Sequence, residues 1–129
     1  MQKITFIINP KAGYREYKYV ENQISKYLDT KKFYPNIFYS KSKGDAKKIA
    51  QKEIKNGSDI IIAVGGDGTV NEVSSALINS NKKMGVIPIG SGNGLAFSLG
   101  ISKNIKKAIE KINNTKTKKI DTVSINNFH

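Results

Sequence analysis

Short runs of β-branched and aromatic residues alternate along this chain with longer segments in which apolar residues recur every three or four positions. The short runs are bounded by polar residues, glycine or proline, which is typical of strands. They predict five strands, at residues 3–9, 33–39, 59–64, 84–88 and 118–125. The run at 59–64 is apolar at every position after Asp59, so we expect this strand to be buried on both faces of a parallel sheet.

The longer segments predict amphipathic helices between the strands. Their inward positions are Tyr17, Val20, Ile24, Tyr27 and Leu28; Ala46, Ile49, Ala50 and Ile54; Val70, Val73, Leu77 and Ile78; and Ile105, Ala108, Ile109 and Ile112. A further short helix is expected to open within the glycine-rich segment 90–96. Strands that alternate with helices predict a mainly parallel sheet with right-handed crossovers, and hence a single doubly wound α/β domain with helices on both faces.

The segment that follows the buried strand, residues 65–73 (GGDGTVNEV), is suited to holding a phosphate group. Open α/β sheets bind their ligands at the carboxyl ends of the strands. Three glycines around Asp67 let the backbone approach an oxyanion, and they leave one carboxylate for a metal ion or a hydroxyl proton. Thr69 and Glu72 have the spacing of a capping box, which predicts a helix start at the same place. A tight turn with no ligand is the alternative explanation of these residues.

Two more loops are expected at the same edge of the sheet. Residues 9–13 (NPKAG) follow the first strand, where Asn9 could bind a nucleotide group, Lys11 could supply a positive charge, and the glycine could permit close approach; ordinary turn chemistry explains them as well. Ser91 and Asn93 follow the fourth strand, and the glycines around them expose both side chains and backbone amides. The chain lacks a P-loop motif and the Gly-x-Gly-x-x-Gly motif of dinucleotide-binding folds.

The charge of the chain is strongly positive, with 22 basic and 10 acidic residues and a formal net charge of +12. Arg15 is the only arginine, which argues against a reader of DNA bases, because such proteins favour arginine for contacts to guanine. Many lysines lie opposite the apolar face of a predicted helix, as expected for a solvated surface. A lysine-rich face would also hold the protein weakly at an anionic membrane.

Composition restricts the cellular setting. Zero cysteines exclude disulfides and thiolate metal sites. No apolar run reaches the length of about 18 residues that a membrane span needs, and the first strand is too short to be a signal peptide. We therefore expect a cytoplasmic protein, peripheral on the inner face of the membrane. The single histidine, His129, has no partner with which to form a metal site or a catalytic base.

Three motifs in this order, at 9–13, 65–73 and 88–96 (PIGSGNGLA), resemble the diacylglycerol kinase catalytic-domain family, which includes bacterial diacylglycerol kinases and sphingosine kinases. The Gly-Gly-Asp-Gly element is shared with NAD kinases and phosphofructokinases, whose amino-terminal domains have the same predicted fold. The third motif is similar to the lipid kinases and differs from the corresponding loop of NAD kinases.

The resemblance implies ATP-dependent phosphorylation of a lipid hydroxyl, with ATP and Mg²⁺ as cofactors. It implies that Asp67 acts through magnesium or orients the acceptor hydroxyl, as the catalytic and metal-binding residue. By position in the motifs, the expected nucleotide-binding residues are Asn9, Pro10, Lys11, Ala12, Gly13, Ser40, Gly65, Gly66, Asp67, Gly68, Thr69, Val70, Asn71, Ser91, Gly92 and Asn93. Ser40 and Ser91 stand where many bacterial members have threonine, and the change keeps the hydroxyl.

Family members continue into a second, β-rich domain that completes the lipid pocket, whereas this sequence ends at His129. We therefore expect residues 1–129 to be the nucleotide-binding part of a longer kinase, with little activity alone. The expected partners are a nucleotide and a lipid substrate at the membrane surface, and the resemblance also implies a homodimer. Three alternatives stay open: a kinase with a soluble acceptor, of the NAD kinase type; a basic nucleic-acid-binding module; and a non-catalytic regulatory module.

Overall fold

A sheet of four parallel strands forms the centre of the molecule, in the order β2-β1-β3-β4. The computed structural model describes residues 1–11, 16–89 and 105–114. The strands are β1 (Gln2–Ile8), β2 (Phe33–Tyr39), β3 (Ile60–Gly65) and β4 (Lys83–Pro88). The labelled helices are α1 (Glu16–Tyr27), α2 (Asp45–Lys55) and α3 (Asp67–Leu77), and residues 105–113 form another helix.

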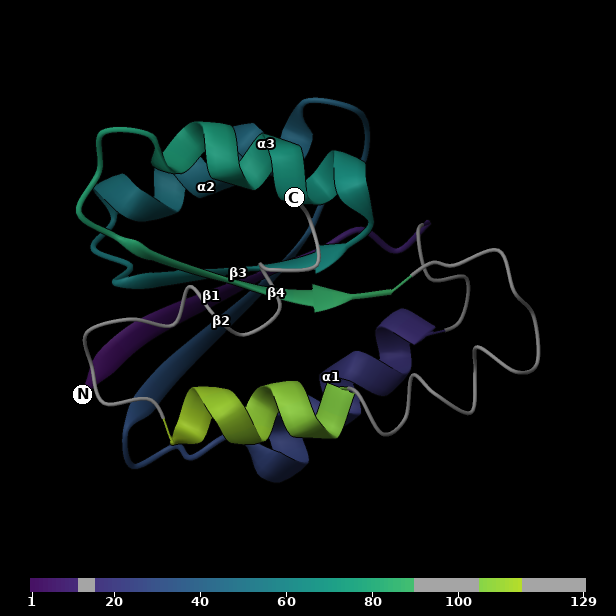
Figure 1. The fold of residues 1–129 in the computed structure, drawn as a ribbon, viewed down its shortest axis with the longest axis vertical. Helices are drawn as coiled ribbons and strands as arrows, with labels where there is room; N and C mark the ends of the chain where they lie inside the picture. Colours follow the sequence, from purple (N-terminus) through teal and green to yellow (C-terminus); the bar gives the residue numbers. More distant parts are fainter. Residues whose placement is uncertain (12–15, 90–104, 115–129) are drawn as a thin grey trace.

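The helices form a layer on each side of the sheet. Figure 1 shows α2 and α3 over one face, and α1 with helix 105–113 over the other. This arrangement confirms the predicted doubly wound α/β fold. Four of the predicted strands lie within one or two residues of their expected bounds, while the strand expected at 118–125 and the short helix expected from segment 90–96 lie outside the described residues.

The end of α3 differs from the prediction. Helical spacing predicts that Ile78 is buried, but α3 ends at Leu77 and the Ile78 side chain is 68% exposed. The next residue, Asn79, has a φ of 67°. Asparagine tolerates this left-handed conformation better than most residues do, and it turns the chain away from the helix axis. The apolar spacing therefore continues one residue beyond the helix.

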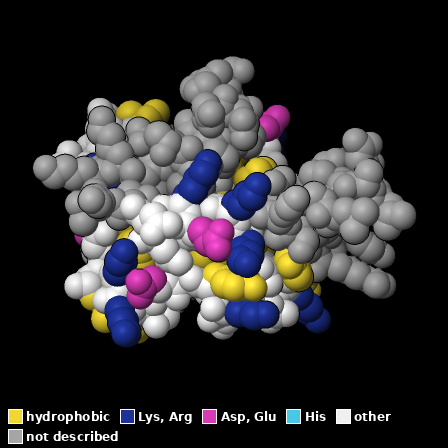
Figure 2. Space-filling model, turned by 60° about the horizontal axis from the view of Figure 1, so that its bottom comes forward, with side chains coloured by type: hydrophobic (Ala, Val, Ile, Leu, Met, Phe, Trp, Pro, Cys, Tyr) yellow, Lys and Arg dark blue, Asp and Glu magenta, His cyan; other side chains and the backbone are white. Residues whose placement is uncertain are grey.

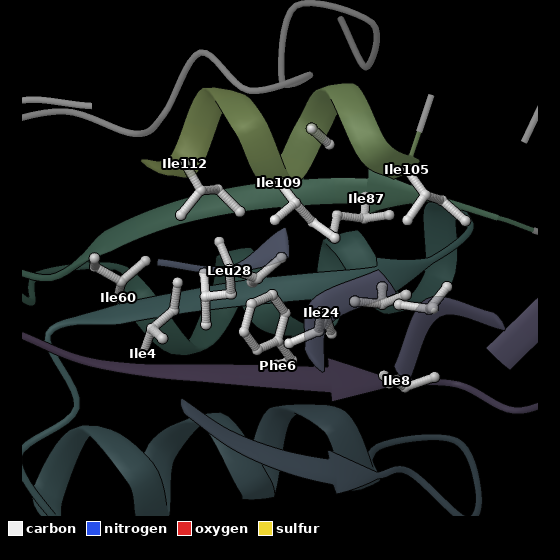
Figure 3. Close-up of a cluster of buried hydrophobic side chains, with 14 of the residues drawn as sticks. Ile4, Phe6, Ile8, Ile24, Leu28, Ile60, Ile87, Ile105, Ile109 and Ile112 are labelled. Atoms are coloured by element: carbon white, nitrogen blue, oxygen red, sulfur yellow. The ribbon is translucent and has the colours of Figure 1, made fainter. Parts of the chain in front are cut away.

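The larger hydrophobic cluster lies between the sheet and the layer of α1 and helix 105–113 (Figure 3). Phe6 and Ile60 project from the strands, Leu28 follows α1, and Ile109 and Ile112 project from helix 105–113. All five side chains are buried. Burial of each such side chain stabilises the fold by about 1.5–3 kcal/mol, so this cluster accounts for the docking of both helices.

Asn113 fixes the end of helix 105–113 to the end of α1. Its Nδ2 donates to the Tyr27 carbonyl at 2.7 Å, and its Oδ1 accepts from the Asp29 N–H at 2.8 Å. The ammonium groups of Lys26 and Lys106 lie 5.5 and 4.9 Å from the centre of the Tyr27 ring, within the range of cation–π attraction. The two hydrogen bonds of Asn113 join segments that are more than 80 residues apart in sequence.

Candidate functional site

The carboxyl ends of the four strands meet along one edge of the sheet. The ladder of backbone hydrogen bonds continues past the strand ends there: Ser40 N–H donates to the Ile8 carbonyl at 2.9 Å, and Asn9 N–H donates to the Val64 carbonyl at 3.0 Å. The loops after β1, β2 and β3 therefore begin side by side. This adjacency follows from the strand order, which places β1 between β2 and β3.

A pocket of about 330 Å³ opens at this edge. Three segments line it: the start of the loop after β1, the β2–α2 loop (residues 40–44) with the start of α2, and the first two turns of α3. The lining residues are Asn9, Lys11, Ser40, Lys41, Ser42, Lys43, Ala46, Gly68, Thr69 and Glu72. Three lysines and one glutamate are among them, so the pocket combines a positive balance with small polar groups.

The first turn of α3 forms the floor of the pocket. Gly66 is the N-cap residue, and no side chain caps this terminus within the part of the chain that the structure describes. Asp67, the first helical residue, is exposed, and Gly68 next to it has no atom near the position that a Cβ would take. The first-turn N–H groups of a helix have no partner inside the helix, and together with the dipole they attract an anion.

Glu72 does not form the capping box that its spacing from Thr69 predicts. Its carboxylate reaches the neighbouring helix and accepts hydrogen bonds from the amino-terminal N–H groups of α2. The Gly44 N–H lies 2.9 Å from Oε2, and the N–H groups of Ala46 and Lys47 lie 3.1 and 3.4 Å from Oε1. The prediction of a capping box was therefore wrong, because the glutamate caps another helix.

The β2–α2 loop is held by its own hydrogen bonds. The Lys41 N–H donates to Asp45 Oδ2 at 2.7 Å, and the Asp45 N–H donates to the Ser42 carbonyl at 3.1 Å. Gly44 has a φ of 89°, a left-handed conformation that favours glycine. This geometry leaves Lys41 and Lys43 exposed on the pocket while the backbone between them is fixed.

The loop after β1 begins with an Asx turn. Asn9 Oδ1 accepts a hydrogen bond from the Lys11 N–H at 3.0 Å. This contact positions Lys11, which is exposed at the pocket. The Asn9 side chain thus shapes the loop and still borders the pocket with its remaining surface.

The structure brings together five of the residues expected to bind nucleotide, namely Asn9, Lys11, Ser40, Gly68 and Thr69. The other described candidates border these without lining the pocket: Pro10, Gly65, Gly66, Asp67, Val70 and Asn71. Of these, Val70 turns its side chain into the hydrophobic cluster beneath α2 and α3. The remaining candidates lie outside the described residues: Ala12, Gly13, Ser91, Gly92 and Asn93.

Five lining residues were missed by the sequence analysis: Glu72, for which only a capping role was predicted, and four residues of the β2–α2 loop and the start of α2, namely Lys41, Ser42, Lys43 and Ala46. The signal that could have found these four is the position of their loop, directly after the carboxyl end of a parallel strand, where ligands are expected.

Among the described residues, no three acidic or histidine side chains are grouped so that they could hold a metal ion without further ligands. Mg²⁺ is commonly bound through one or two carboxylates together with the phosphate oxygens of a substrate. Exposed Asp67, beside the floor of the pocket, fits this second mode of binding. A magnesium ion at this site would therefore depend on the phosphate groups of the ligand.

Comparison with known proteins agrees with the fold. The family model for the diacylglycerol kinase catalytic domain matches residues 3–125. Diacylglycerol kinases of Staphylococcus haemolyticus and Bacillus subtilis are each 32% identical to the chain over 98% of its length. A crystal structure of a diacylglycerol kinase from Bacillus anthracis superposes on 87% of the chain with a TM-score of 0.62 and 32% identity.

The chain spans about two fifths of these relatives: 39% and 43% of the two curated kinases, and 42% of the crystallised chain. Among the described residues, no helix is long and apolar enough to cross a membrane. The match of the family model to nearly all of the chain, together with the fold and the loops at the sheet edge, shows that this protein belongs to the diacylglycerol kinase catalytic domain family.

Proposed function

We propose that residues 1–129 are the nucleotide-binding part of an ATP-dependent lipid kinase, and that the pocket at the carboxyl edge of the sheet holds the phosphates of ATP. The observation that carries this proposal is the contrast between two helix amino termini at one pocket. The terminus of α2 already receives the carboxylate of Glu72, whereas the terminus of α3 has no side-chain cap among the described residues. A phosphate group would therefore bind at α3.

The side chains around the α3 terminus suit a polyphosphate. Gly68 leaves space for close approach to the backbone, and Thr69 is also among the lining residues of the pocket. Lys11, Lys41 and Lys43 place three positive charges around it. Such charges, with helix N–H groups, stabilise the developing charge of a transferred phosphoryl group.

Asp67 is the proposed catalytic residue. Its carboxylate at the start of α3 would hold Mg²⁺ together with the phosphates, and the metal would neutralise charge on the γ-phosphoryl group. The acceptor in this proposal is a lipid hydroxyl, as the names of the relatives indicate for those proteins. The chain spans about two fifths of the length of these relatives. In this proposal a second, β-rich domain would complete the lipid pocket.

The lipid substrate would be met at a membrane surface, and the lysines on α2 suit such a surface. The exposed side of α2 carries four lysines, Lys47, Lys48, Lys52 and Lys55. Of the two carboxylates of α2, Glu53 is buried, and Asp45 lies in the first turn and accepts a hydrogen bond from the Lys41 N–H. On the opposite layer, by contrast, Figure 2 shows lysines with carboxylates between them. We therefore propose that α2 faces the anionic leaflet, where each lysine contributes about 1 kcal/mol.

Calorimetric titration of the chain with ATP, with and without Mg²⁺, tests the nucleotide site. We expect saturable binding that strengthens with Mg²⁺ and that loses its dependence on Mg²⁺ in Asp67→Asn. Glu110→Gln is the matched control, because it removes one negative charge from the exposed side of helix 105–113, on the other layer of the fold. Equal affinity and equal magnesium dependence in wild type and Asp67→Asn would contradict the role given to this carboxylate.

A second variant tests the position of the phosphates. Gly66 has an extended φ of −99°, and the nearest atom to a Cβ there, the Ile89 carbonyl oxygen, is 3.9 Å away. The fold should therefore accept Gly66→Leu, while the longer side chain obstructs the α3 terminus. Normal ATP affinity in a folded Gly66→Leu variant would refute the placement of the phosphates.

A further inference from the structure

We propose that Glu72 is a positioning residue that fixes the β2–α2 loop against α3 and thereby sets the distance between two sides of the nucleotide pocket. The proposal rests on the proposed nucleotide binding at this pocket. One side of the pocket is formed by Gly68 and Thr69 of α3, and the other by residues 40–43. Glu72 lies on α3 and is hydrogen-bonded to the segment that follows residues 40–43.

The contacts of Glu72 span a large sequence separation. Both carboxylate oxygens are used: Oε2 accepts from Gly44 at 2.9 Å, and Oε1 accepts from Ala46 at 3.1 Å and Lys47 at 3.4 Å. These residues are 25 to 28 positions away in the chain. Hydrogen bonds from N–H groups to a charged carboxylate are among the stronger ones in proteins. One side chain therefore joins the start of α2 to the second turn of α3.

The same contacts compensate the charge of Glu72. A carboxylate beside a triphosphate site would repel the ligand if it were solvated and free. Here the N–H groups and the dipole of α2 offset the negative charge, so the side chain can stand in the lining of an anion site. Glu72 also occupies N–H donors of α2 that would otherwise compete with α3 for phosphate.

The two possible roles of Glu72 predict opposite changes in ATP affinity when the residue is replaced. If it acts only through its charge, its removal brings the pocket to a more positive balance and raises ATP affinity. If it positions the loop, its removal loosens the attachment of the β2–α2 loop to α3 and lowers ATP affinity. Charge alone also predicts equal effects for Glu72→Gln and Glu72→Ala, since both are neutral. Positioning predicts a graded loss, because Gln keeps one acceptor oxygen for Ala46 and Lys47 and Ala keeps none.

The experiment is calorimetric titration of the full chain with ATP and Mg²⁺, for wild type, Glu72→Gln, Glu72→Ala and the charge control Glu110→Gln. The titrations are carried out at a temperature at which circular dichroism shows that each variant is folded. We expect the dissociation constant to rise about tenfold in Glu72→Gln, as for loss of a charge-assisted hydrogen bond, and further in Glu72→Ala. Glu110→Gln should match wild type. Unchanged or tighter binding in both Glu72 variants would overturn the proposal.

Amide hydrogen exchange measured by NMR keeps this test separate from the proposed function. The N–H groups of Gly44 and Ala46 should exchange faster in Glu72→Gln than in wild type, with or without nucleotide. Unchanged exchange would overturn the proposed link between the helices. If wild type bound no ATP while exchange changed as expected, the nucleotide site would be refuted and the structural link retained. Glu72→Gln keeps the length of the side chain, so the test stands even if Glu72→Ala does not fold.

Discussion

Thr69 lies directly over Gly65, so that a Cβ on Gly65 would be 2.7 Å from Thr69 Oγ1 and 2.9 Å from Thr69 Cβ. The Thr69 side chain is 5% exposed and lines the pocket. Because Gly65, at the end of β3, has no side chain, the first turn of α3 can lie close to the sheet. This close approach puts the helix terminus at the carboxyl edge of the strands.

The first prediction concerns this contact. Gly65→Ala should force Thr69 away and lower the free energy of unfolding by about 1–3 kcal/mol, as overpacking commonly does. Urea unfolding followed by circular dichroism measures the change. ATP affinity should fall as well, because the floor of the pocket moves. A variant as stable as wild type would show that the helix can shift at no cost.

Gly68→Ala is the matched control for stability. It introduces the same methyl group three residues later, where no atom lies within 4 Å of the new Cβ. Alanine is a better helix former than glycine by about 1 kcal/mol, so this variant should be more stable than wild type. Alanine substitutions at the two glycines of this motif should therefore change stability in opposite directions.

The strands could be predicted from sequence because their signal is local. The β3 run, Ile60 to Val64, is apolar throughout, and a strand buried on both faces needs this pattern. The pocket was only partly predictable, since it depends on the strand order. Lys41 and Lys43 reach it because β2 pairs with β1, and no spacing along the chain encodes that pairing.

The contacts of Glu72 show a second limit of sequence reasoning. Its spacing from Thr69 is compatible with a cap on its own helix, yet it caps α2, whose start lies about 28 residues away in the chain. Local spacing identifies a carboxylate that can cap a helix, but not which helix. The choice is made by the packing of α2 beside α3, which is a tertiary effect.

The second prediction concerns the attachment of helix 105–113. Asn113→Ala removes the hydrogen bonds to the Tyr27 carbonyl and the Asp29 N–H, and should lower the free energy of unfolding by about 1–3 kcal/mol. The neighbouring exposed Asn114 is the control, since Asn114→Ala should change stability little. Denaturant unfolding of both variants compares them. Equal stability of the two would mean that hydrophobic burial alone holds this helix.

The third prediction concerns the Tyr39 hydroxyl, which is buried and has no hydrogen-bond partner among the described residues. The Tyr39 ring packs edge-on against Tyr17 with centroids 5.9 Å apart. Tyr39→Phe keeps the ring and removes a desolvated polar group, so the free energy of unfolding should stay constant or rise by up to about 1 kcal/mol. Exposed Tyr34→Phe should have no effect. A clear loss of stability in Tyr39→Phe would show that the hydroxyl is hydrogen-bonded after all.

The last prediction compares two glycines that share a backbone conformation and differ in place. Gly44 and Gly57 have φ values of 89° and 92°, and at neither does any atom lie within 4 Å of the position that a Cβ would take. Alanine in the left-handed region costs about 1–2 kcal/mol, so both variants should lose similar stability. Only Gly44 belongs to the β2–α2 loop and donates to Glu72, so only Gly44→Ala should weaken ATP binding. Calorimetry and urea unfolding on both variants separate the two effects; equal ATP affinities would show that the loop conformation does not shape the pocket.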